Sequence, residues 1–190
     1  MNVLKQYRGF FVYLAGPIDF EKDGGVGYRK SLKEKLKKIG VSEEMILDPC
    51  DKPVIGDDFI DIDSEKEQFD RLREHRMWDE AEKCAKMTMH IDLRFVDKSD
   101  LVIATVNPNI PMCGTWDEVF MARNQKKPVI LIDPRGREKT HMWAIGRVGY
   151  KNIFKTQDDA IAYLDDILHT RIPVDMTEWL FLQFNGKKKK

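Results

Sequence analysis

Short apolar runs alternate with helical patterns along this chain. Three runs rich in β-forming residues cover Phe10 to Leu14, Leu101 to Val106 and Pro128 to Ile132, and two shorter runs cover Met45 to Leu47 and Asn152 to Phe154. Turn residues and then a segment with helical spacing follow each run. This alternation predicts a doubly wound α/β domain, with a mainly parallel five-stranded sheet and helices on both faces.

Four helical segments accompany these strands. The first has apolar residues at helical spacing from Leu32 to Ile39 and ends at Gly40. The second is a long charged stretch from Ser64 to about Lys86, and the last two cover residues 116–125 and 157–169. The segments are amphipathic, as expected for helices that pack on a sheet.

The ends of the first three strands are where such a fold binds its ligands. In flavodoxin-like and Rossmann-like sheets, ligands bind outside the carboxyl ends of the strands, near the point where the strand order reverses. The loops that begin at Gly16, Asp48 and Asn107 should therefore converge on one crevice. The glycines of the first loop could approach a sugar or phosphate, and Arg29 could pair with an anion, although a plain turn and a solvated arginine fit equally well.

Composition narrows the class of protein. A length of 190 residues suits one domain, which we place at residues 1–186 before a lysine tail at 187–190. The 32 basic and 32 acidic residues cancel, which argues against a duplex nucleic-acid partner. No apolar run approaches the roughly 18 residues of a membrane span. The three cysteines and four histidines lack metal-ligand spacing, which predicts reduced thiols, a cytoplasmic location, and neither metal nor cofactor.

Residues 114–118, Gly-Thr-Trp-Asp-Glu, are the first candidate for chemistry. They follow an apolar strand and open a helical pattern, so we expect Glu118 in the first turn of a helix. There the helix dipole and free backbone N–H groups would keep the carboxylate ionised, and an ionised carboxylate can attack an electron-poor carbon. The same spacing fits a capping box, in which Thr115 and Glu118 only satisfy helix donors, and Ser31-x-x-Glu34 and Ser64-x-x-Glu67 fit it too.

Four stretches in fixed order match one known family. They are Val12 to Ile18, the Asp48-Pro49 strand end, Asp92 through Ala104, and Gly114-Thr-x-x-Glu118 with the strand that follows Lys127. From Val12 to about Phe154, the chain resembles the nucleoside 2-deoxyribosyltransferase family, which includes nucleotide N-glycoside hydrolases of the same build.

The resemblance implies a double displacement at the anomeric carbon of a sugar. It implies that Glu118 is the nucleophile, that Asp92 protonates or holds the departing base, and that Tyr13 hydrogen-bonds near the nucleophile. Two acids with different tasks need different environments, so Asp92 should be the less solvated of the pair. Substrate contacts are expected from Gly16, Pro17, Ile18, Asp19, Arg29, Asp48, Gly114, Trp116, Met142 and Trp143.

The expected substrate is a small-molecule nucleoside or its 5′-monophosphate, whose sugar passes to another base or to water. Transferases of the family often carry an acidic residue shortly before the Gly-x-x-x-Glu segment, where this chain has Met112 and Cys113. That departure weakens transfer to a base relative to hydrolysis. It also leaves open a catalytically silent nucleotide-binding module, or a scaffold protein in which Glu118 only caps a helix.

A neighbouring subunit often completes the active site in this family. The resemblance therefore implies a homo-oligomer, a dimer or higher, with a shared active site. The apolar and aromatic segment around Met142 and Trp143 has the character that such a contribution needs, although the same residues could simply cover the core under a loop.

Overall fold

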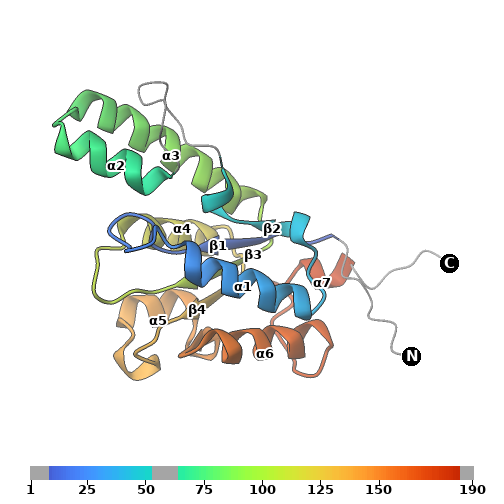
Figure 1. Ribbon diagram of the computed structural model, residues 1–190. Helices are drawn as coiled ribbons and strands as arrows, with labels where there is room; N and C mark the ends of the chain where they lie inside the picture. The colour runs from blue at the N-terminus through green and yellow to red at the C-terminus, as the bar shows by residue number, and fades with distance from the viewer. Residues whose placement is uncertain (1–8, 53–63, 185–190) are drawn as a thin grey trace.

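One parallel sheet organises the chain, of which the computed structural model describes residues 9–52 and 64–184 (Figure 1). The strand order is β2–β1–β3–β4–β5, and every neighbouring pair is parallel. All five predicted strands are confirmed, with bounds that move by at most two residues. The strands are β1 (Val12–Ala15), β2 (Ile46–Leu47), β3 (Leu101–Thr105), β4 (Val129–Ile132) and β5 (Ile153–Phe154).

Helices cover both faces of this sheet, which confirms the doubly wound architecture. Successive side chains of a strand point to opposite faces, so Val12 and Leu14 enter one apolar layer while Tyr13 and Ala15 enter the other. The first layer packs under α1 (Val26–Lys38) and α6 (Gln157–Leu168), which lie side by side in Figure 1. The second packs under α3 (Trp78–Lys98), α4 (Cys113–Asn124) and α5 (Met142–Val148).

The long predicted helix from Ser64 to about Lys86 is two helices. Helix α2 (Glu65–Glu74) ends at His75, the chain turns at Arg76 with a φ of 55°, and α3 then runs on to Lys98. No glycine or proline marks this break, so the sequence pattern could not locate it. The two helices form a hairpin that stands out from the sheet (Figure 1).

Capping follows the backbone rather than the sequence motif. Ser64 and Thr156 are true N-caps, because each side chain accepts a hydrogen bond from the third following residue's N–H. Ser31 lies inside α1 and Thr115 inside α4, so neither is an N-cap, and the predicted capping box at Thr115 is wrong. Helix α4 begins earlier than expected, with Met112 as its N-cap.

The C-terminal apolar segment packs on its own domain. Trp179 and Phe181 are buried in the layer that contains α1 and α6, and the Phe181 ring stacks on Phe10 with centroids 4.5 Å apart. Helix α7 (Phe181–Phe184) is the last described element, and the predicted lysine tail at 187–190 lies outside the described residues. Short 3₁₀ helices cover Glu43–Met45, Pro49–Asp51, Arg137–Lys139 and Tyr150–Asn152.

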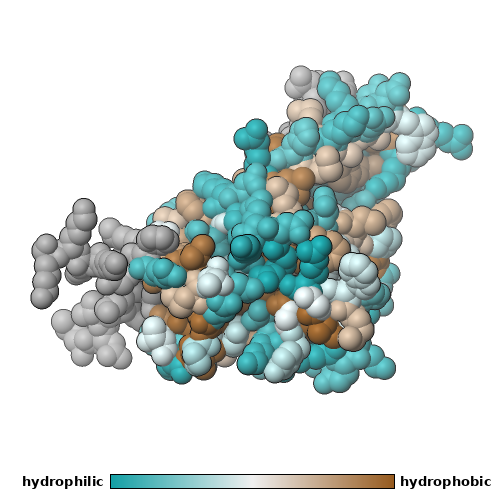
Figure 2. Space-filling view, turned by 180° about the vertical axis from the view of Figure 1, so that it is seen from behind, coloured by the Kyte–Doolittle hydropathy of each residue, from teal (hydrophilic) through white to brown (hydrophobic). Residues whose placement is uncertain are grey.

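The face of the molecule seen from behind is largely polar (Figure 2). Seen from behind, polar residues cover most of the visible face, and hydrophobic residues lie in small separate patches (Figure 2). Over the described parts of the chain, we find no helix with the length and apolar character needed to cross a membrane. Cys50 and Cys113 are free thiols, and the Cys84 thiol donates a hydrogen bond to Gln68 Oε1.

Candidate active site

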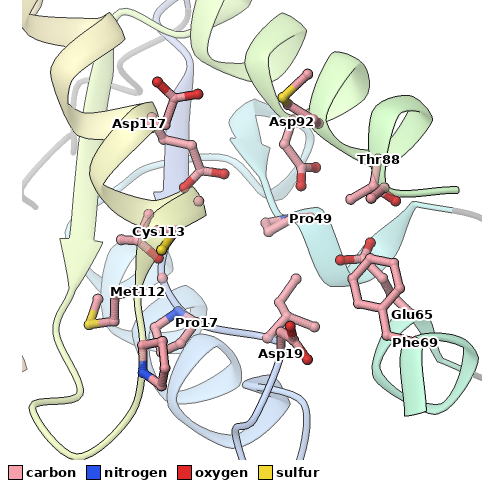
Figure 3. Close-up of a pocket in the computed structure, with 18 of the residues that line it drawn as sticks. Pro17, Asp19, Pro49, Glu65, Phe69, Thr88, Asp92, Met112, Cys113 and Asp117 are labelled. Atoms are coloured by element: carbon pink, nitrogen blue, oxygen red, sulfur yellow. The ribbon is translucent and has the colours of Figure 1, made fainter. Parts of the chain in front are cut away.

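A cavity of about 310 Å³ lies beside the carboxyl ends of β1 and β3, where the strand order reverses. Its described walls come from the loop after β1, from Pro49, from α2 and α3, and from the start of α4. Figure 3 shows Asp92 and Thr88 of α3 across the cavity from Cys113 of α4, with Pro17 on a third side. The predicted convergence of the three loops is therefore observed.

Glu118 lies at the buried end of this cavity, with only 8% of its surface exposed. The Tyr13 hydroxyl donates a 2.6 Å hydrogen bond to Glu118 Oε1. Glu118 Oε2 has no hydrogen-bond partner within the described part of the chain. One carboxylate oxygen is thus fixed by β1, and the other remains available for chemistry.

The electrostatic state of Glu118 differs from the prediction. Because α4 begins at Cys113, Glu118 lies in the second helical turn and not in the first, beyond the reach of the free N–H groups. Burial raises the pKa of Glu118 to about 8, the hydrogen bond from Tyr13 opposes that rise, and the Asp92 charge adds to it. The shift favours the neutral, protonated form of the carboxyl group in the unliganded chain.

Asp92 is the second acid of the cavity and is bound to a lysine. Lys52 Nζ lies 2.5 Å from Asp92 Oδ1 and 2.7 Å from Glu65 Oε2. Burial raises the pKa of Asp92, and Lys52 opposes the rise. The Asp92 side chain is 13% exposed, whereas Glu118 is 8% exposed as a residue and its Oε2 is fully buried. The expectation that Asp92 is the less solvated acid is wrong.

Arg29 holds the loop after β1 and does not face the cavity. Its side chain is fully buried, and its guanidinium donates to the carbonyl oxygens of Leu14, Gly16 and Gly25. A Cβ at Gly25, whose φ is 79°, would collide with this guanidinium. The predicted role of Arg29 as an anion ligand is wrong, because its donors are used within the fold.

Asp48 is also a structural residue. It is 5% exposed, caps the 3₁₀ helix that begins at Pro49, and pairs with Lys33 at 2.6 Å and with Arg29 at 3.6 Å. It does not appear among the residues of the cavity wall, where its neighbour Pro49 does. The prediction that Asp48 contacts substrate is therefore not supported, and its carboxylate instead neutralises buried cations.

Five of the predicted substrate-binding residues do line the cavity. They are Gly16, Pro17, Ile18, Asp19 and Gly114. The Asp19 carboxylate is held by Arg73 of α2 through two hydrogen bonds, of 2.9 and 2.5 Å. That bidentate pair fixes the wall of the cavity to the α2–α3 hairpin. Within the described residues, no group of three or more His, Cys, Asp and Glu side chains is arranged to hold a metal ion.

Trp116, Met142 and Trp143 lie elsewhere. Trp116 and Trp143 line a second, more open groove of about 500 Å³, together with Phe120. Met142 and Trp143 are 73% and 71% exposed. None of the three is among the described wall residues of the cavity that contains Glu118. Their contribution to a neighbouring subunit, and the homo-oligomer itself, stay predictions.

Sequence reasoning missed Lys52 and Glu65. Glu65 directly follows the true N-cap Ser64, so the capping signal located the start of α2 but not the direction of its first side chain. Lys52 is a single lysine after a short strand, with nothing in its local pattern to single it out. Lys52 meets Asp92 and Glu65 only in the folded chain, where the loop after β2 packs against α2 and α3.

A family model matches most of the chain. The model described as nucleoside 2-deoxyribosyltransferase matches residues 12–151, which is more than half of the chain. The chain belongs to the nucleoside 2-deoxyribosyltransferase family. The matched range contains Tyr13, Asp92 and Glu118, the three residues that were expected to carry the chemistry. A search among curated proteins finds no match.

Solved structures support the same fold. A 2-deoxyribosyltransferase from Leishmania mexicana aligns with a TM-score of 0.57 at 18% identity, covering 83% of this chain and 98% of its own. The enzyme of that name from Bacillus psychrosaccharolyticus gives 0.55 at 16%, covering 80% and 90%. A conserved protein from Enterococcus faecalis V583 gives 0.55 at 17%, covering 86% and 99%. At such identities the nucleoside 2-deoxyribosyltransferase fold is shared, while the reaction needs its own argument.

The raised pKa of Glu118 predicts a cost in stability. Its pKa is about 8 in the folded chain against an ordinary 4.5, so between these values the folded state holds a proton that the unfolded state has lost. The free energy of unfolding should therefore fall as the pH rises from about 4.5 to about 8, and Glu118→Gln should remove the Glu118 contribution to this fall. We expect the variant's gain in Tm over the parent to be larger near pH 9 than near pH 5.

Thermal unfolding at both pH values checks this prediction. The matched control is Glu74→Gln, which removes an exposed carboxylate from α2. An equal effect of the two substitutions at both pH values would contradict the burial of the Glu118 charge.

Proposed function

We propose that this chain cleaves the N-glycosidic bond of a nucleoside through a covalent glycosyl ester on Glu118, and passes the sugar to another base or to water. The observation that carries the proposal is the pairing of two acids in one cavity. Glu118 is buried and bonded to Tyr13, and Asp92 faces the same space from α3. A nucleophile and a proton donor on opposite sides of a sugar are what double displacement requires.

In the first half of the reaction, when the substrate is bound, the single proton of the acid pair moves from Glu118 to Asp92, and a carboxylate oxygen of the ionised Glu118 then attacks C1′ of the sugar. The bond between C1′ and the base nitrogen breaks, and its electron pair leaves with the base, which takes a proton from Asp92. Tyr13 supports this step, because burial raises its pKa well above the usual value and its hydroxyl therefore stays a donor. It keeps Oε1 in place while Oε2 is free to react.

In the second half, water or another base attacks C1′ and the ester bond to Glu118 breaks. The proton released by the attacking group returns to Asp92, so the pair of acids ends the cycle as it began. The pair needs one proton in all, which agrees with a pKa of about 8 for Glu118 at rest. The positive charge that develops on the sugar favours the ionised form of Glu118. The negative charge that develops on the departing base favours a proton on Asp92, which faces the base.

The charge of the cavity favours a neutral nucleoside over a nucleotide. Five of its described wall residues are acids and none is a lysine or arginine, and the nearby Arg29, Arg73 and Lys52 are each paired within the fold. The acids are Asp19, Glu65, Asp92, Asp117 and Glu118. Such a wall repels a phosphate dianion. A volume of about 310 Å³ lies at the low end of the roughly 300–1,000 Å³ of small-molecule sites, as suits a compact substrate.

The acceptor depends on the residues around the sugar. Met112 is 8% exposed in the cavity wall, and its sulfur accepts a hydrogen bond from the backbone N–H of Asn107. A thioether cannot make the strong hydrogen bond to a sugar hydroxyl that a carboxylate makes at this position in family transferases. We therefore propose that hydrolysis accompanies or replaces transfer.

A panel of nucleosides, with and without a second base, tests the proposal. The parent protein should release the base, or exchange it, at a rate that Glu118→Gln lowers by roughly 100-fold or more. Ligand-induced thermal stabilisation without any turnover would instead support a silent binding module. An unchanged rate in Glu118→Gln would remove the covalent mechanism.

Loss of the Tyr13 hydroxyl should slow the reaction and move its pH range. With a singly protonated pair as the active form, kcat/KM of the parent should fall above about pH 8. The Tyr13 bond favours ionised Glu118, so Tyr13→Phe should move this alkaline limb to higher pH and lower kcat/KM by roughly 10- to 100-fold. Pre-steady-state and steady-state pH profiles measure both effects.

Tyr163→Phe is the matched control for this experiment. Its hydroxyl donates to Asn152 Oδ1 at 2.9 Å, far along the chain from the cavity wall. Equal profiles for the two phenylalanine variants would contradict the role given to Tyr13.

A 5′-phosphate should make a nucleoside a poorer substrate, with a lower kcat/KM. Repulsion by the acidic wall should lower kcat/KM for a deoxynucleoside 5′-monophosphate by roughly 10-fold or more relative to the parent nucleoside. Added salt should narrow the difference by screening. Comparison of one nucleoside with its monophosphate at low and high ionic strength measures this, and a preference for the monophosphate would show that a cation reaches the substrate.

A further inference from the structure

Lys52 is the cation that lies among the acids of the cavity. Its ammonium nitrogen lies 2.5 Å from Asp92 Oδ1 and 2.7 Å from Glu65 Oε2. The lysine side chain is only 4% exposed, and each acid side chain is 13% exposed. Both acids belong to the cavity wall, whereas Lys52 is not among the residues that line it. The three charges therefore form one buried group that touches the site through its two acids.

Three separate elements meet at this group. Lys52 follows the 3₁₀ helix after β2, Glu65 is the first residue of α2, and Asp92 lies in α3. Removing three charges from water is costly, and a well-packed apolar cluster would join the same elements at least as firmly. The ion pairs of Lys52 with Glu65 and Asp92 therefore serve to control the charge at the cavity and contribute little to stability.

We infer that Lys52 is a positioning residue for the glycosyl-transfer reaction: it fixes the Asp92 carboxylate and, together with Glu65, sets how many protons the acids of the cavity hold. The inference rests on the proposed function, since it gives Lys52 a task in the chemistry of Asp92 and Glu118. Because Lys52 binds Oδ1, the other oxygen of Asp92 is left to meet the base. Lys52 itself does not touch the substrate.

The charged groups around Asp92 come from every element packed against it. Lys52 favours its ionised form, as does the more distant Arg29, and the acids disfavour it. Burial alone would lower the pKa of Lys52, but the two carboxylates raise it, so the ammonium stays charged. The surrounding groups are Lys52, Glu65 of α2, Glu118 of α4, Tyr13 of β1 and Arg29 of α1.

This arrangement gives opposite expectations for its two partners. Lys52→Met removes a positive charge, so both limbs of the kcat/KM profile should move to higher pH, and the acid limb, which depends most on Asp92, by roughly 1 pH unit or more. Glu65→Gln removes a negative charge beside the same lysine, so the acid limb should move to lower pH. A link that only joined α2 to α3 would respond to both substitutions in the same way.

The experiment measures full pH profiles on the nucleoside that the parent cleaves fastest. Lys52→Arg keeps the charge and should leave both limbs within a few tenths of a unit, or about a twofold change in proton affinity, of the parent. Lys33→Met is the matched control, because Lys33 also joins two acids, Asp48 and Asp51, at 2.6 Å each, outside the cavity wall. Its profile should not move, whatever its effect on Tm.

The outcomes separate the two proposals. An active parent whose acid limb stays in place in Lys52→Met, or moves the same way in Glu65→Gln, overturns the role of Lys52 alone. A parent that neither releases nor exchanges base overturns the proposed function, and the role of Lys52 with it. If Lys52→Met does not fold, the direction of the Glu65→Gln shift and the profile of Lys52→Arg decide the question.

Discussion

The hydrogen bond between Tyr13 and Glu118 connects the fold to the chemistry. Tyr13 is fully buried in β1. Glu118 lies in α4, 105 residues further along the chain. Only the parallel order β2–β1–β3, with α4 following β3, brings these two side chains to the same edge. Every other part of the site is arranged around a carboxyl group that is out of water and held by one donor.

A buried carboxyl group has two consequences that oppose each other. Loss of water raises the pKa of Glu118, which destabilises the ionised fold, and the same loss leaves Oε2 poorly solvated and reactive once it is ionised. The neighbouring Asp92 raises the pKa of Glu118 further, whereas Lys52 and the hydrogen bond from Tyr13 lower it. Functional sites commonly trade stability in this way.

Much of the fold could be predicted from the sequence because its signals are local. Apolar runs located all five strands, including two that are only two residues long, and the order of elements gave the doubly wound architecture. The break at Arg76 was missed because no glycine or proline marks it. The start of α4 was placed too late, since Met112 is an N-cap without a capping side chain, and the state of Glu118 was then misjudged.

The sequence predicted only part of the site, because several of its contacts join residues that are far apart in the sequence. Spacing and resemblance named Tyr13, Asp92 and Glu118, and the structure brings all three to one cavity or its edge. Arg29 and Asp48 looked like ligands because a short sequence cannot show that their partners lie within the fold. Lys52 and Glu65 were missed because the ion pairs that join them to Asp92 form only when the loop after β2 meets α2 and α3 in the folded chain.

Intact-mass analysis with a 2′-fluoro-2′-deoxynucleoside tests the covalent role of Glu118 most directly, because fluorine slows the loss of the sugar from the ester. The account predicts that the parent protein gains the mass of one fluorinated sugar, that peptide mapping places it on Glu118, and that Glu118→Gln gains none. Base release without any adduct, or an adduct on another residue, would contradict it.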